Sequence, residues 1–167
     1  MKRINKYRGK DMATNEWVYG SLVCGATEDK IPVRYIVPKI QLAKQDDIPS
    51  ALQLIKVHPN SVGQFTGCLD KNGHEVYEGD IVDAWSAGSH VTNGLIRFAS
   101  SGFFILLSSD NGPCGVWYLA PSSGRLTPYK NAGVDEHLLI VGNIFDNADM
   151  VKGYIMYCIE RKKAWYD

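Results

Sequence analysis

The sequence has none of the short motifs that mark familiar active sites. It contains no Cys-x-x-Cys pair, no Walker phosphate-binding loop and no Gly-x-Ser-x-Gly element. The four histidines are scattered without a His-x-x-x-His pair, at His58, His74, His90 and His137. These absences argue against a thiol redox site, a P-loop nucleotidase, a serine hydrolase elbow and a zinc site. We therefore expect no catalytic residue, no bound metal and no cofactor.

The sequence also lacks clustered cysteines and long apolar runs. Four cysteines are spread widely through the 167 residues, which favours reduced thiols in an intracellular protein. No apolar run reaches the roughly 20 residues that a membrane helix needs. The basic N-terminus is not followed by the apolar stretch of a signal peptide. We therefore expect a cytoplasmic protein without a membrane segment.

The sequence also lacks an excess of charge of either sign. Lys and Arg together number 18, and Asp and Glu also number 18, so the formal net charge is zero. This balance argues against a protein that binds polyanions through bulk charge, and it is compatible with self-association.

The charge is unevenly distributed, with seven basic and four acidic residues between Met1 and Ile36. This N-terminal segment mixes basic residues with aromatic ones such as Trp17 and Tyr19. Two interpretations stand: a stacking and phosphate-binding surface for nucleic acid, or core aromatic residues with basic rims. The residues that would contact nucleic acid in the first interpretation are Arg3, Lys6, Arg8 and Lys10.

What the sequence does contain is a clear turn and strand pattern between Gly63 and Trp85. The stretch from Asp70 to Gly73 predicts a hairpin turn, because Asn72 and Gly73 tolerate positive φ. Glu78-Gly79-Asp80 predicts a second turn that leads into an apolar strand. We assign Asn72, Gly73, Gly79 and Asp80 structural roles in these turns. The carboxylates of this stretch are interpreted as acceptors of backbone N–H bonds or as solvated groups, not as a metal site or an acid–base pair.

Short strands separated by tight turns predict a mainly β, antiparallel fold of the β-rich α+β type. We expect three parts: N-terminal strands, including a hairpin, over residues 1–57; a small SH3-like barrel over 58–147; and a C-terminal helix over 148–167. Apolar residues recur at helical spacing in the last part. Its aromatic side chains either fold back on the barrel or pack against a second copy, and the candidates for self-association are Tyr154, Tyr157 and Trp165.

Four groups of residues carry a resemblance to a known family. They are Tyr7-Arg8-Gly9-Lys10 with Glu16–Leu22, Pro59 with Val62–Gly67, Asp70–Gly73 with Tyr77–Val82, and Val141–Asn147. In this order they resemble the YopX family of phage and prophage proteins of bacteria. The resemblance implies an SH3-like β-barrel with additional strands. It implies no agreed biochemical activity and carries over no catalytic or binding residue.

Two functions remain open at this point. The first is a non-enzymatic interaction or assembly module that self-associates, with a protein partner as a further option. The alternative is a small nucleic-acid-binding barrel in phage replication or regulation. An enzyme built from dispersed residues has no motif to support it.

Overall fold

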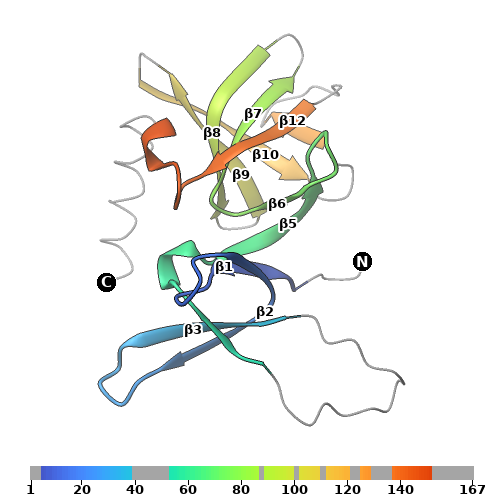
Figure 1. Ribbon diagram of the computed structural model, residues 1–167. Helices are drawn as coiled ribbons and strands as arrows, with labels where there is room; N and C mark the ends of the chain where they lie inside the picture. Colours follow the sequence, from blue (N-terminus) through green and yellow to red (C-terminus); the bar gives the residue numbers. More distant parts are fainter. Residues whose placement is uncertain are drawn as a thin grey trace. The chain divides into compact units, whose positions relative to one another are not determined.

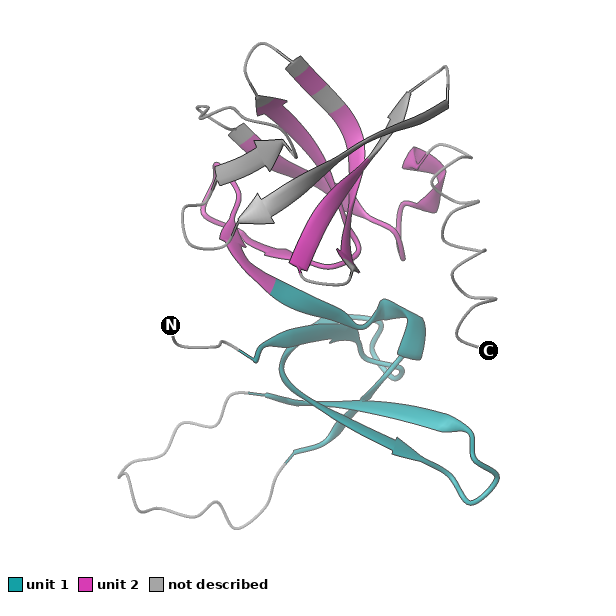
Figure 2. Cartoon of the chain, turned by 180° about the vertical axis from the view of Figure 1, so that it is seen from behind, with its two compact units in different colours: residues 1–65 teal, residues 66–167 magenta. Residues whose placement is uncertain are grey.

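The computed structural model describes residues 5–38, 53–86, 89–99, 102–109, 112–120, 125–128 and 137–151. The chain divides into two compact units, residues 1–65 and 66–167 (Figure 2). The strands form two antiparallel sheets, which confirms the predicted mainly β class. The part of the chain that is described contains no helix long and apolar enough to cross a bilayer.

The first unit is built on four strands and the start of a fifth. Its elements are β1 (Tyr7–Lys10), β2 (Trp17–Ala26), β3 (Pro32–Pro38), β4 (Ile55–Val57), the 3-10 turn η1 (Pro59–Ser61) and β5 (Gly63–Leu69), which continues into the second unit. β1 and β2 form an antiparallel hairpin, and β3 and β4 extend the sheet beyond β2. The connection between β1 and β2 is tight because the Asp11 carboxylate accepts the N–H of Ala13 at 2.8 Å, and Asn15 adopts a φ of 59°.

The second unit contains the remaining strands (Figure 1). They are β6 (Glu75–Tyr77), β7 (Asp80–Ser86), β8 (Ser89–Ala99), β9 (Gly102–Ser109), β10 (Gly112–Ala120), β11 (Arg125–Pro128) and β12 (His137–Asn143). The first sheet has the order β4-β3-β2-β1-β5-β6, and the second has the order β11-β10-β9-β8-β7-β12.

Among the described residues, the larger of two buried apolar clusters lies inside the second unit. It takes side chains from β5 and β6 as well as from strands of the second sheet: Cys68, Val76, Val82, Ala84, Ile96, Phe103, Ile105 and Leu138. Burial raises the pKa of the Cys68 thiol to about 11, and this outweighs the opposing hydrogen bond with Thr66. The thiol is therefore protonated at neutral pH and behaves as a small apolar side chain.

The closed SH3-like barrel that we predicted is not formed by the described residues. Both sheets have open strand orders, ending at β4 and β6 and at β11 and β12. A closed barrel needs a continuous ladder of backbone hydrogen bonds between its first and last strands. The turns on either side of β6 instead make isolated backbone hydrogen bonds with strands of the second sheet. The N–H of Lys71 donates to the carbonyl of Leu138, and the N–H of Gly79 donates to that of Ile96. The second unit thus consists of two sheet segments around the cluster just described, with a smaller buried apolar cluster formed by Ile81, Leu95 and Val151.

The predicted C-terminal helix does not begin at residue 148 as an α-helix. Ala148–Met150 form the short 3-10 turn η2, and Val151 already has extended backbone angles, with φ −94° and ψ 121°. Residues 152–167 lie outside the described part of the chain, and with them the self-association candidates Tyr154, Tyr157 and Trp165.

Candidate functional site

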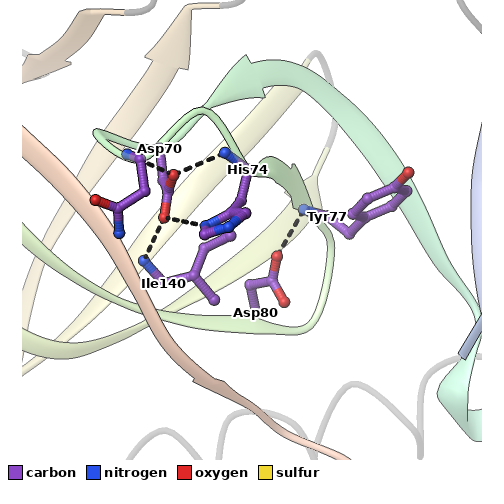
Figure 3. Close-up of polar contacts among 6 residues, drawn as sticks. Asp70, His74, Tyr77, Asp80 and Ile140 are labelled. Carbon is purple, nitrogen blue, oxygen red and sulfur yellow. Dashed lines mark hydrogen bonds and ion pairs between the residues drawn. The ribbon is translucent and has the colours of Figure 1, made fainter.

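The hairpin turn between β5 and β6 is organised by one buried carboxylate, that of Asp70 (Figure 3). Its side chain is wholly buried. Oδ1 accepts the N–H of Asn72 at 2.8 Å and that of His74 at 2.9 Å. Oδ2 accepts the N–H of Ile140, on β12, at 3.4 Å, and the His74 ring nitrogen lies at the same distance. A single side chain therefore connects the turn to β12.

Two opposing effects act on the pKa of Asp70. Burial alone would raise it, but the backbone N–H groups of His74, Asn72 and Ile140 stabilise the anion, and the net result is a lowered pKa. The carboxylate is thus ionised at neutral pH, and its oxygens are engaged by donors from the backbone. This arrangement connects the turn to β12 through an ionised side chain.

The second turn has a similar construction. Asp80 is fully buried, and its Oδ2 accepts the N–H of Tyr77 at 2.8 Å (Figure 3). Gly79 and, in the first turn, Gly73 have φ values of 86° and 82°, in the left-handed region that favours glycine. Among the described residues, no three His, Cys, Asp or Glu side chains gather where they could hold a metal ion.

The first unit brings basic and aromatic side chains onto one side of its sheet. The register pairs Arg8 with Tyr19, Lys10 with Trp17, and Tyr35 with both Val23 and Lys56. Residues opposite each other in an antiparallel sheet point to the same side, and successive residues alternate. We call this side the basic–aromatic face, and its members are Lys6, Arg8, Lys10, Trp17, Tyr19, Val23, Tyr35 and Lys56. None of the strands β1 to β4 carries an Asp or Glu.

The cations on β1 lie against the rings on β2. The Arg8 guanidinium carbon is 4.5 Å from the centroid of the Trp17 ring, and Lys10 Nζ is 5.3 Å from it. Lys6 Nζ lies 5.9 Å from the centroid of the Tyr19 ring. Arg8 and Lys10 are each only 8% exposed. Their charges are therefore directed largely at the indole.

The open part of the basic–aromatic face lies farther from Trp17. Tyr19 is 44% exposed and Val23 43% exposed; Lys56 is exposed, and Lys6 and Tyr35 are half-buried. Of the predicted contacts for nucleic acid, Lys6, Arg8 and Lys10 are thus brought together, while Arg3 lies outside the described residues. Lys56 was missed because it lies in a separate strand, and only the pairing of β3 with β4 brings it to this face.

Beyond its contacts with β1 and β4, the hairpin of β2 and β3 continues as a two-stranded ribbon (Figure 1). Ile31 near its end is 58% exposed, and residues 23–32 are all exposed. The connection is an ordered turn, which we call the ribbon tip (residues 27–31). The N–H of Thr27 donates to the carbonyl of Ile31, and the N–H of Lys30 to that of Thr27, both at 2.9 Å. The tip presents the carboxylates of Glu28 and Asp29.

Comparison with known proteins agrees with the sequence motifs. The family described as YopX protein matches residues 6–152 of the chain. No curated protein matches it. The crystal structure of protein EF1440 from Enterococcus faecalis is similar at 19% sequence identity and a TM-score of 0.46, covering 90% of this chain and 100% of that one. Since the family match spans most of the chain, the resemblance drawn from the sequence is confirmed, and the chain belongs to the YopX family.

Proposed function

We propose that this chain is a non-enzymatic interaction module that self-associates, with the role of a phage or prophage accessory protein in the bacterial cytoplasm. The observation that carries the proposal is the ribbon of β2 and β3. Within the part of the chain that the structure describes, the outer half of this ribbon pairs only within itself, and residues 23–32 are exposed. Two-stranded ribbons of this kind are marginally stable in water unless something packs on them.

Burial of apolar side chains on the ribbon supplies a driving force for association. Val23 and Ile31 are large apolar residues that remain 43% and 58% exposed. Covering such a side chain is worth about 1 to 2 kcal/mol, given that full burial contributes roughly 1.5 to 3 kcal/mol. Because the formal net charge of the chain is zero, electrostatic repulsion between two copies is weak.

We expect the protein to sediment as a dimer or larger species at high concentration. Sedimentation velocity over roughly 5 to 100 μM should show a rising average mass, and the Val23→Ser, Ile31→Ser double variant should weaken association at least about tenfold, a loss near 1.4 kcal/mol. The matched control is Leu54→Ser, which removes a side chain that is 53% exposed in the same unit but outside the ribbon. A wild-type protein that stays monomeric throughout this range contradicts the proposal.

A second candidate function is the binding of single-stranded nucleic acid by the basic–aromatic face. The acid-free strands and the exposed Tyr19 favour it, because bases stack on exposed aromatic rings for about 1 to 3 kcal/mol each. The near burial of Arg8 and Lys10 against Trp17 reduces the number of cations available for phosphates. We therefore rank this function second.

Nucleic-acid binding has a separate test. If it occurs, fluorescence anisotropy with a labelled oligonucleotide at low salt should give a dissociation constant below about 10 μM, stronger than most non-specific binding. Replacing two cations of the face in the Lys6→Glu, Lys56→Glu variant should then abolish the anisotropy increase. The Lys30→Glu variant, changed on the ribbon tip, should bind the oligonucleotide nearly as the wild type does. Absence of binding by the wild-type protein to single- or double-stranded DNA or RNA eliminates this candidate.

A further inference from the structure

We propose that the ribbon tip of one copy docks on the open part of the basic–aromatic face of a second copy, and that the two copies exchange this contact reciprocally. The inference rests on the self-association proposed above and names the surfaces that make it. Both surfaces belong to the first unit, so each copy brings one tip and one face. A reciprocal pair of contacts closes the assembly as a two-fold dimer.

Charge separation within the first unit is the first argument. Strands β1 to β4 carry no carboxylate, and the acidic residues of the described part of this unit lie in its turns: Asp11, Glu16, Glu28 and Asp29. The ribbon tip carries two of them side by side, Glu28 and Asp29, both exposed, together with one exposed cation, Lys30, so its carboxylates outnumber its cations. The face carries Lys56, which is exposed, and Lys6, which is half-buried over Tyr19. Unlike charges on the two surfaces steer one copy toward the other.

The tip also has the shape and stiffness of a docking element. Its backbone is fixed by the two turn hydrogen bonds, and the N–H of Ile31 donates to the Thr27 hydroxyl at 3.1 Å. A turn that is already ordered loses little conformational entropy when it binds. Lys30 adopts a φ of 61°, which completes the tight reversal of the chain.

An apolar anchor accompanies the charges. Exposed ion pairs are individually weak, so charge alone does not hold such a contact together. Ile31 follows the acidic pair after one residue, Lys30, and is 58% exposed, while the face offers the ring of Tyr19 and the side chain of Val23, both more than 40% exposed. In the proposed contact, the acidic pair and Ile31 of the tip thus meet the cations and the apolar side chains of the face. Because the dimer is reciprocal, each of these contacts occurs twice in it.

The test is a charge exchange between two variants. Glu28→Lys, Asp29→Lys reverses the tip, and Lys6→Glu, Lys56→Glu reverses the face. Each variant alone brings like charges together at both contacts, so we expect its association to weaken at least about tenfold relative to wild type. An equimolar mixture should restore the dimer, because the reversed tip then meets the reversed face and the native tip meets the native face. Sedimentation velocity and fluorescence-detected mixing measure both results.

The matched control changes the same amount of charge elsewhere. Glu16→Lys, Asp149→Lys alters two exposed carboxylates outside the proposed contact, and we expect it to associate as the wild type does. Circular dichroism and thermal melting establish that each variant is folded. Raising the salt concentration toward 1 M, where the Debye length falls to about 3 Å, should weaken the wild-type dimer.

The outcomes separate this inference from the proposed function. A wild-type dimer that neither reversed variant disrupts overturns the inference and leaves self-association standing. A mixture of folded, monomeric variants that fails to associate also overturns the inference. A wild-type protein that is monomeric overturns both proposals. Oligonucleotide binding by a monomeric wild type, lost in the face variant, assigns the face to nucleic acid instead of a second copy.

Discussion

The Gly20→Ala variant is expected to be strongly destabilised. A Cβ atom at residue 20 of β2 would lie 1.9 Å from the carbonyl oxygen of Val37, 2.6 Å from its carbonyl carbon and 2.9 Å from the Cα of Pro38. These are backbone atoms of β3, so no side-chain rotation relieves the overlap. The two strands must separate where Gly20 pairs with Pro38. We expect a loss of about 3 kcal/mol or more in the free energy of unfolding, at the upper end of the cost of overpacking.

The same strand offers a matched control in Gly25. A Cβ atom there would meet only the Val33 Cγ2 atom, at an ordinary contact distance of 3.5 Å. Gly25→Ala should change stability by no more than about 0.5 kcal/mol. Urea unfolding followed by circular dichroism measures both variants, and similar stabilities for the two would contradict the close approach of β2 and β3 at Gly20.

The second large effect is expected for Asp70→Ala. The substitution removes the acceptor for the backbone N–H groups of Asn72, His74 and Ile140. These donors are partly buried, so water can replace the lost hydrogen bonds only in part. We expect a loss of about 3 kcal/mol, because an unsatisfied buried donor costs roughly 1 to 3 kcal/mol and water relieves part of the total. Asp70→Asn should be intermediate, since its one amide oxygen accepts in the turn while its NH₂ group cannot accept from Ile140.

The Asp70 carboxylate also predicts a pH dependence of stability. Its pKa is lowered in the folded state from the ordinary value of 3.8, so the folded chain binds fewer protons than the unfolded chain in this range. The stabilisation is complete above the ordinary value and is lost as the pH falls through the lowered one. The difference in unfolding free energy between wild type and Asp70→Asn should therefore shrink on acidification below about pH 4.

A control addresses the neighbouring imidazole. The His74 side chain is 71% exposed and touches Asp70 only through a contact of 3.4 Å. His74→Ala keeps the backbone N–H that donates to Asp70, so we expect it to retain most of the stability and the acid dependence. Loss of the acid dependence in this variant would assign the effect to the ring and not to the backbone donors.

The local parts of the structure were predictable from neighbouring residues. Asn72-Gly73 and Gly79-Asp80 determine their turns through positive φ values at glycine and through carboxylates that accept nearby N–H groups. Alternating apolar residues indicated most strands. These signals act over a few positions, so they can be read without knowing the tertiary structure.

The remaining features depend on contacts between distant segments. The bond from Ile140 to Asp70 joins residues 70 positions apart, and no local pattern marks it. Barrel closure was wrongly predicted for the same reason, because turn positions do not determine whether adjacent strands form a continuous ladder or isolated bonds. Lys56 joins the basic–aromatic face only through the pairing of β4 with β3. Conversely, Lys6, Arg8 and Lys10 were named from the sequence as possible contacts for nucleic acid, but only the structure shows how far Arg8 and Lys10 are buried against Trp17.

The position of β12 has a consequence for synthesis on the ribosome. β12 pairs with β7 along nearly its whole length and supplies the N–H of Ile140 to Asp70, yet residues 87–136 lie between the two strands in the sequence. While the nascent chain ends before residue 137, β7 lacks this neighbour and the Asp70 anion lacks one of its donors. Final consolidation of the second unit therefore waits for translation to pass β12, and until then this edge of the sheet is open to chaperones and to premature aggregation.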